Sequence, residues 1–206
     1  RRVETPVASS TDTLDTIDPT KHIADPGPLG LAGFALTTFV LSTFNAGLLP
    51  KELEAVVLPL ALFYGGLAQL LAGMWEFRKN NTFGALAFTS YGAFWLSFAT
   101  YVKFVAGGLP AESAHSATGL FLLAWTIFTL YMLIGSAKTN TALFLTFIVL
   151  EVTFVFLTLG AFMASSTMST IGGWLGLVTA FLAWYVSAAG LLNPMYKRAL
   201  LPTGPR

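Results

Sequence analysis

The sequence contains no cysteine in its 206 residues, which excludes disulfides, thiolate metal sites and cysteine nucleophiles. Charge is also scarce, because charged residues make up 10% of the chain against about 25% in a typical soluble domain. A net charge of +1 gives no indication of nucleic-acid binding. The two histidines, His22 and His115, are far apart and outside the apolar stretches. The pattern therefore predicts no metal and no cofactor.

Motifs for catalysis are missing as well. No glycine-rich loop follows a strand, so no site for a nucleotide phosphate is predicted. Serine and threonine are plentiful, but no histidine lies in an apolar stretch to act as a base for them. We therefore expect a protein that is not an enzyme.

Apolar residues, in contrast, make up 55% of the chain and gather in six long stretches. Each stretch is about 20 residues long, which lets a helix cross a hydrocarbon core of about 30 Å. A buried soluble bundle would need polar outer faces, which these stretches lack. The sequence predicts an all-α integral membrane protein of the cell membrane, with six transmembrane helices at 29–49, 56–76, 83–105, 117–136, 142–164 and 171–192.

The remaining segments predict the organisation and the orientation. Residues 1–24 are expected to be a disordered polar tail, 25–201 a six-helix transmembrane domain, and 202–206 a short C-terminal tail. Of the lysines and arginines, only Lys51 and Lys103 fall on one side of the predicted bundle. The other side collects Lys21, Arg78, Lys79, Lys138, Lys197 and Arg198. The positive-inside rule then places both termini in the cytoplasm.

Small residues at regular spacing predict close packing of these helices. Gly65, Gln69 and Gly73 form one stripe, and a second small-residue face repeats every four residues from Ala85 through Thr89. In lipid, such faces let backbones approach closely where no hydrophobic drive brings helices together. The faces predict a compact bundle and are compatible with an oligomer.

Several polar residues inside the stretches predict that the bundle encloses a space lined by side chains, not only a packed core. Thr38, Ser42 and Asn45 recur on one face of the first helix, one turn after Phe34. Polar groups on one stripe of a membrane helix face protein or water. Asn45 and Gln69 could serve as interhelical hydrogen-bond partners or contact a solute. Glu151 is either a proton-coupling carboxylate, part of a structural pair for which Lys103 is a candidate partner, or a neutral side chain hydrogen-bonded to a neighbouring helix.

The segment Asp25–Leu31, which reads Asp-Pro-Gly-Pro-Leu-Gly-Leu, resembles the signature of the acetate uptake transporter family, of the SatP or YaaH type. Residues 63–76 and 81–95 support the resemblance, which covers 25–201. It implies a six-helix protein that carries acetate and, in some members, succinate, assembled as hexamers with a pathway in each protomer. The family's hydrophobic constriction would fall on Phe34, Tyr91 and Leu150, and Ala183 matches a position linked to substrate size. Asp25 departs from the usual Asn.

Together these observations predict proton-coupled membrane transport of acetate, and of succinate or other short carboxylates, through a constriction in each protomer of a homo-oligomer. A passive acetate anion channel and a non-transporting membrane scaffold or sensor are the alternatives. Phe34 and Leu150 are expected to pack the methyl group of acetate. The carboxylate would accept hydrogen bonds from Thr38, Asn45, Gln69 and the Tyr91 hydroxyl, and Glu151 is the candidate for proton coupling.

Overall fold

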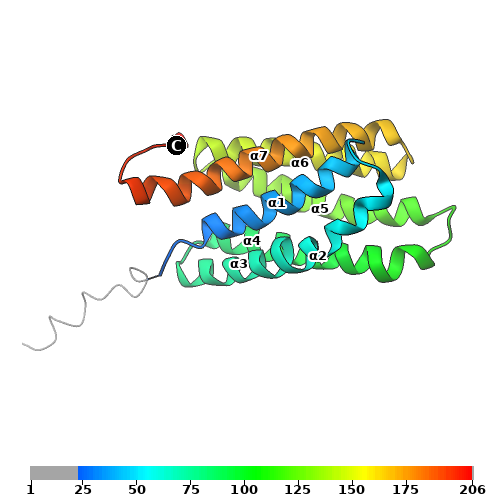
Figure 1. Ribbon diagram of the computed structural model, residues 1–206, viewed down its shortest axis with the longest axis horizontal. Coiled ribbons are helices and arrows are strands. Elements are labelled where there is room, and N and C mark those ends of the chain that lie inside the picture. Colours follow the sequence, from blue (N-terminus) through cyan, green and yellow to red (C-terminus); the bar gives the residue numbers. More distant parts are fainter. Residues whose placement is uncertain (1–22, 206) are drawn as a thin grey trace, which may run out of the picture.

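The computed structural model describes residues 23–205, and in this part of the chain all the regular structure is helical. Six rods lie side by side and alternate in direction along the chain (Figure 1). The second and third rods are composite, because short 3₁₀ and π segments join their α-helices end to end. The rods are α1 (Gly27–Asn45); η1 (Lys51–Val56), α2 (Val57–Leu62), η2 (Phe63–Ala68) and α3 (Gln69–Arg78); α4 (Thr82–Thr100), η3 (Tyr101–Val105) and η4 (Ala106–Gly108); α5 (Ala114–Ser136); α6 (Thr141–Phe162); and α7 (Ser166–Tyr196).

Five of the six rods are long and apolar enough to cross a membrane: Gly27–Asn45, Lys51–Arg78, Ala114–Ser136, Thr141–Phe162 and Ser166–Tyr196. The remaining rod, which begins with α4, packs against α3 within the same bundle. The predicted all-α membrane fold with six helices is therefore confirmed. The expected N-terminal tail lies outside the described residues except for its last two.

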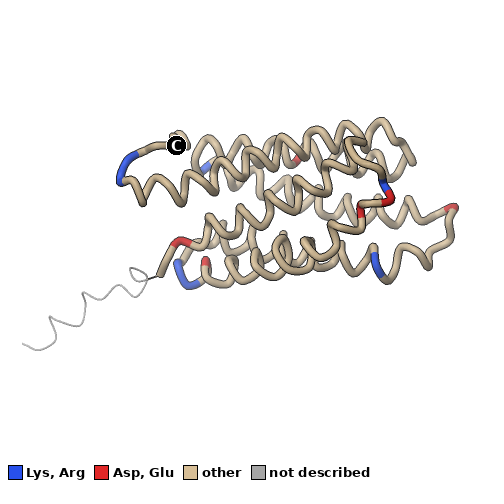
Figure 2. Tube along the Cα trace, viewed as in Figure 1, with Lys and Arg blue, Asp and Glu red and all other residues tan. Residues whose placement is uncertain are grey.

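Most basic residues of the described part gather at one end of the bundle, and Lys51 and Lys103 lie at the other (Figure 2). Arg78 and Lys79 follow α3, Lys138 follows α5, and Lys197 and Arg198 follow α7. The start of α1 and the end of the chain lie at this same end (Figure 1). That this end faces the cytoplasm stays a prediction of the positive-inside rule.

Side-chain caps explain where two of the helices begin. The Oδ1 atom of Asn81 accepts a hydrogen bond from the backbone N–H of Gly84 at the start of α4. Asn140 does the same for Leu143 at the start of α6. Such caps satisfy N–H groups that have no partner within the helix.

Small residues bring the backbones together, as their spacing predicts. A Cβ atom on Gly73 of α3 would collide with both the backbone N and the side chain of Thr89 on α4. A Cβ on Gly173 of α7 would collide with the backbone of Ala46 at the end of α1. These contacts fix α4 on α3 and α7 on α1, and so set the position of the space between the two helix pairs.

The C-terminal segment 201–205 lies against the ends of α6 and α7. The Asn193 side chain exchanges two hydrogen bonds of 2.9 Å with the backbone of Leu201, and the Tyr185 hydroxyl donates to the carbonyl of Pro202. The backbone N–H of Thr141, in the first turn of α6, donates to the carbonyl of Gly204 at 2.7 Å. The segment therefore satisfies donors that the start of α6 leaves free.

We predict that Gly73→Ala lowers the thermal stability of the purified protein in detergent by several degrees, because the added methyl group forces α3 and α4 apart. Overpacking of this kind costs about 1–3 kcal/mol. Gly107→Ala is the matched control, since nothing lies within 4 Å of a Cβ atom there. Equal melting temperatures for the two variants would show that the α3–α4 contact is not tight.

Candidate functional site

Two cavities open toward opposite ends of the bundle. Cavity 1, of about 450 Å³, is lined by the first half of α1, the starts of α4 and α6 and the end of α7. Cavity 2, of about 580 Å³, is lined by the second halves of α1, α4 and α6 and the start of α5. Phe34 and Leu150 line both cavities, so the two spaces meet at these side chains.

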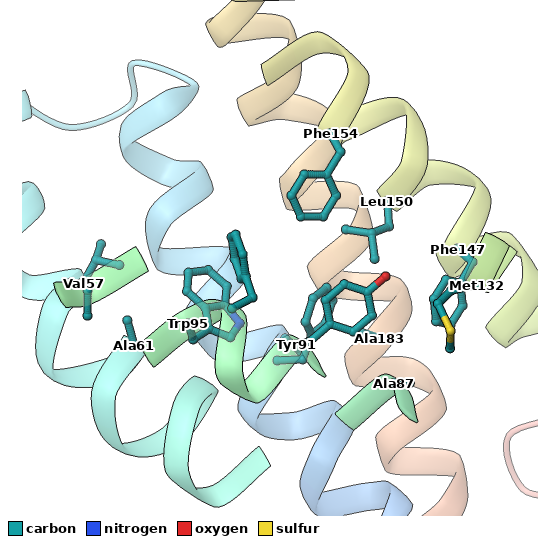
Figure 3. Packing of buried hydrophobic residues seen from close by; sticks show 14 of the residues in the cluster. Val57, Ala61, Ala87, Tyr91, Trp95, Met132, Phe147, Leu150, Phe154 and Ala183 are labelled. Atoms are coloured by element: carbon teal, nitrogen blue, oxygen red, sulfur yellow. The ribbon is translucent and has the colours of Figure 1, made fainter. Parts of the chain in front are cut away.

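The point where the cavities meet is an apolar neck, formed by Phe34 of α1, Tyr91 of α4 and Leu150 of α6. All three are buried, with exposed fractions of 7%, 3% and 5%. The ring centroids of Phe34 and Tyr91 are 5.8 Å apart. Figure 3 shows Tyr91 and Leu150 projecting toward the same interior region, with Phe154 beyond Leu150. The structure thus brings together the three residues that the family resemblance places at a constriction.

The hydroxyl of Tyr91 has a hydrogen-bond partner within the protein. It donates a hydrogen bond of 3.0 Å to Oγ1 of Thr129 on α5, and Thr129 donates in turn to the carbonyl of Trp125. The Tyr91 hydroxyl is thus already paired within the protein, and a hydrogen bond from it to a carboxylate stays a prediction. Tyr91 contributes the face of its ring to the neck, and its bond to Thr129 fixes the orientation of that ring.

Polar atoms without a hydrogen-bond partner occur along the two cavities. Among the described residues, five buried side-chain atoms have none: Thr38 Oγ1, Gln69 Oε1, Thr89 Oγ1, Trp95 Nε1 and Glu151 Oε2. Gln69 lines cavity 1, and Thr38 and Trp95 line cavity 2. A buried group of this kind costs about 1–3 kcal/mol. Three of the five therefore bear this cost in side chains that line the cavities.

A pair of carboxyl groups lies at the wide end of cavity 1. Glu76, which is 2% exposed, accepts a 2.8 Å hydrogen bond from the Asn81 side chain, and Asp25 accepts one from the backbone N–H of Gly27. A Cβ atom on Gly27 would lie 3.2 Å from Asp25 Oδ1 and 3.7 Å from Glu76 Oε1, so the two carboxyl groups flank this glycine. The sequence gives no sign of this burial, because Glu76 lies only two residues before Arg78 at the end of an apolar stretch.

The other predicted residues fall in different places. Asn45 lines cavity 2, where its Oδ1 accepts a 3.4 Å hydrogen bond from Lys51. Ala183 is fully buried in the core beside the neck but lines neither cavity. Glu151 is half-buried next to Leu150 and also lines neither cavity.

The expected pair between Glu151 and Lys103 does not form. Lys103 is exposed in η3, whereas Glu151 lies near the middle of α6. Tyr91, at the level of Leu150, is 12 residues before Lys103 on the same rod, which corresponds to about 18 Å along the helix axis. The residue types were compatible with a pair, but their depths in the bundle are not.

Comparison with known proteins shows similarity over almost the entire chain. The sequence profile described as the GPR1/FUN34/yaaH family matches residues 12–205. Accumulation of dyads protein 2 of Saccharomyces cerevisiae is 45% identical over 179 residues, which cover 84% of this chain and 63% of the yeast protein. The chain therefore spans less than two thirds of the length of that relative.

Two bacterial proteins match along nearly their full length. The succinate-acetate/proton symporter SatP of Escherichia coli is 37% identical over 182 residues, covering 88% of this chain and 96% of the bacterial one. The solved structure of a bacterial acetate channel, SatP, superposes with a TM-score of 0.83 at 37% identity, covering 88% of this chain and 99% of that chain. The helical arrangement is thus shared with an experimentally determined structure.

We predict that Asn81→Asp lowers the stability of the protein by more than the loss of one hydrogen bond would. The variant keeps the oxygen that caps α4 but replaces the donor to Glu76 with a second carboxyl group, and hydrogen bonds to charged groups contribute about 1.5–3 kcal/mol. Adding Glu76→Gln exchanges donor and acceptor and should restore most of the melting temperature. A double variant no more stable than Asn81→Asp alone would show that the two side chains are not coupled.

Proposed function

The chain belongs to the GPR1/FUN34/yaaH family of membrane proteins, and we propose that it transports acetate and related short carboxylates across the cell membrane through the neck between cavities 1 and 2. The observation that carries this proposal is that Phe34 and Leu150 line both cavities. The two cavities open toward opposite ends of the bundle, so a solute that passes this one apolar constriction has crossed the protein. Relatives described as a succinate-acetate/proton symporter and an acetate channel support the choice of substrate.

The neck suits a small solute with one apolar end. Phe34, Tyr91 and Leu150 offer only carbon surface to the space between the cavities, so they can pack a methyl group. A charged carboxylate loses hydration there, which is costly unless a donor or a proton compensates. Uncompensated polar atoms of Gln69 on one side of the neck and of Thr38 and Trp95 on the other are available to do so.

We predict that Phe34→Ala widens the neck and changes selectivity. Labelled acetate uptake into proteoliposomes should change, and the uptake of longer monocarboxylates such as butyrate should rise several-fold relative to acetate. Phe63→Ala is the matched control, because Phe63 is 67% exposed on the outer surface of η2 and lines neither cavity. Identical selectivity in the two variants would rule out the neck as the route of the solute.

Proton coupling is the mode of transport we propose, because no charged side chain of the neck can compensate a bare acetate anion. A proton that travels with the carboxylate removes the largest part of the desolvation cost. Glu151 is the proposed proton carrier: its Oε2 atom is buried without a partner, and it follows Leu150 in the sequence. Because Glu151 lines neither cavity, it would act from behind the neck rather than in the path of the solute. The alternative is a passive acetate anion channel.

An imposed membrane potential separates the two modes. We predict that acetate uptake into liposomes, above the rate of protein-free liposomes, acidifies the interior and is insensitive to a potassium–valinomycin potential. Uptake that follows the potential without acidification would establish the anion channel. Glu151→Gln should reduce the acidification that accompanies uptake, whereas Glu112→Gln, an exposed residue between η4 and α5, should not.

We further propose that the protein works as a homo-oligomer, a hexamer by resemblance, with its positively charged end in the cytoplasm. Large apolar side chains are exposed on the outer surface of the bundle, among them Phe63, Leu120, Ile127, Ile134 and Phe181, at 60–69%. Such a surface suits both lipid and neighbouring copies of the chain. Cavity 1 would then open to the cytoplasm and cavity 2 to the outside.

A further inference from the structure

We propose that the Thr38 hydroxyl and the Trp95 indole N–H form a carboxylate-binding site on the cavity 2 side of the neck, which holds a short monocarboxylate with its alkyl end toward Phe34 and Leu150. This site rests on the proposed transport function and adds to it the residues that orient the solute. Both side chains line cavity 2.

Thr38 and Trp95 occupy corresponding positions next to the neck. Thr38 lies one helical turn after Phe34 on α1, and Trp95 lies one turn after Tyr91 on α4. α1 and α4 run in the same direction through the bundle (Figure 1). One turn advances each helix by about 5.4 Å, so Thr38 and Trp95 form a layer directly outside the aromatic layer of the neck. Figure 3 shows Trp95 beside Tyr91 on α4.

The Thr38 hydroxyl and the Trp95 indole N–H are both buried, yet neither has a hydrogen-bond partner. Threonine hydroxyls in this bundle commonly donate to the carbonyl four residues earlier, as Thr37 does to Gly33 and Thr43 does to Phe39. Thr38, which is 7% exposed, makes no such bond, and its Oγ1 has no partner. The Nε1 atom of Trp95, a residue only 2% exposed, has no partner either, although an indole N–H can act only as a donor. Both donors belong to residues that line the same cavity, and a carboxylate supplies two oxygens that could accept from them.

The surroundings of this site favour one class of solute. Beyond the donor layer the solute meets Phe34 and Leu150, which offer only carbon atoms. A monocarboxylate can satisfy both surfaces with its two ends. A dicarboxylate held in the same way would press its second carboxylate against the neck, where it finds no donor. The geometry therefore favours acetate and propionate over succinate at this site.

Thr38→Val and Trp95→Phe test the site, because each removes one donor and keeps most of the apolar volume. We expect each to raise the half-saturation concentration for acetate uptake by about three- to tenfold, the effect of losing one hydrogen bond. The matched controls are Thr43→Val, whose hydroxyl is already bonded to Phe39, and Trp184→Phe, which packs against Phe39 and lines neither cavity. Both controls should leave the half-saturation concentration unchanged.

Tryptophan fluorescence of the protein in detergent gives a readout independent of transport. Acetate and propionate should change the emission of the unsubstituted protein and of Trp184→Phe, but not that of Trp95→Phe, and succinate should have a weaker effect. Unchanged half-saturation in both donor variants, with transport intact, would overturn the site and leave the proposed function standing. An unsubstituted protein that carries no acetate would overturn both. Should Trp95→Phe fail to fold, the half-saturation concentration of Thr38→Val alone tests the site.

Discussion

The whole arrangement depends on the close approach of helix backbones at small residues, because lipid supplies no hydrophobic force to hold helices together. Gly73 admits Thr89, and Gly173 admits the end of α1, so two helix pairs are fixed by contacts that leave no room for a side chain. These contacts set how closely the backbones approach within each pair, and the space lies between the pairs. Large residues, among them Phe34 and Leu150, line that space and narrow it to a neck.

Hydrogen bonding divides the interior into two kinds of polar group. In the hydrogen-bond chain from Tyr91 through Thr129 to the Trp125 carbonyl, each hydroxyl has an acceptor, and the chain holds the aromatic ring of Tyr91 in one orientation. Thr38, Gln69 and Trp95 are open, with atoms that are buried but unpaired. A membrane protein interior has little water to satisfy such atoms. Their location on the two cavities, on either side of a closed aromatic layer, connects the packing of the bundle with the passage of a polar solute.

The sequence predicted the fold well, since six apolar stretches and their small-residue stripes carry the information for a helix bundle. The neck residues were identified through a family resemblance, because Phe34, Tyr91 and Leu150 differ in no local property from core residues. The burial of Glu76 could not be predicted, since it depends on Asn81 turning back from the next helix. The unpaired N–H of Trp95 could not be predicted either, because tertiary packing alone decides whether a buried donor has a partner. The pair of Lys103 with Glu151 was wrongly expected, because residue types indicate which charges could pair but not how deep each side chain lies in the bundle.

The shared lining of the two cavities has a consequence for the proposed transport. Because Phe34 and Leu150 border both spaces, a solute that took the proposed route would block the neck for solutes arriving from either end. Movement along that route would be single-file. Solutes entering from opposite sides would then compete for the same passage, and a high concentration on one side would slow unidirectional flux from the other.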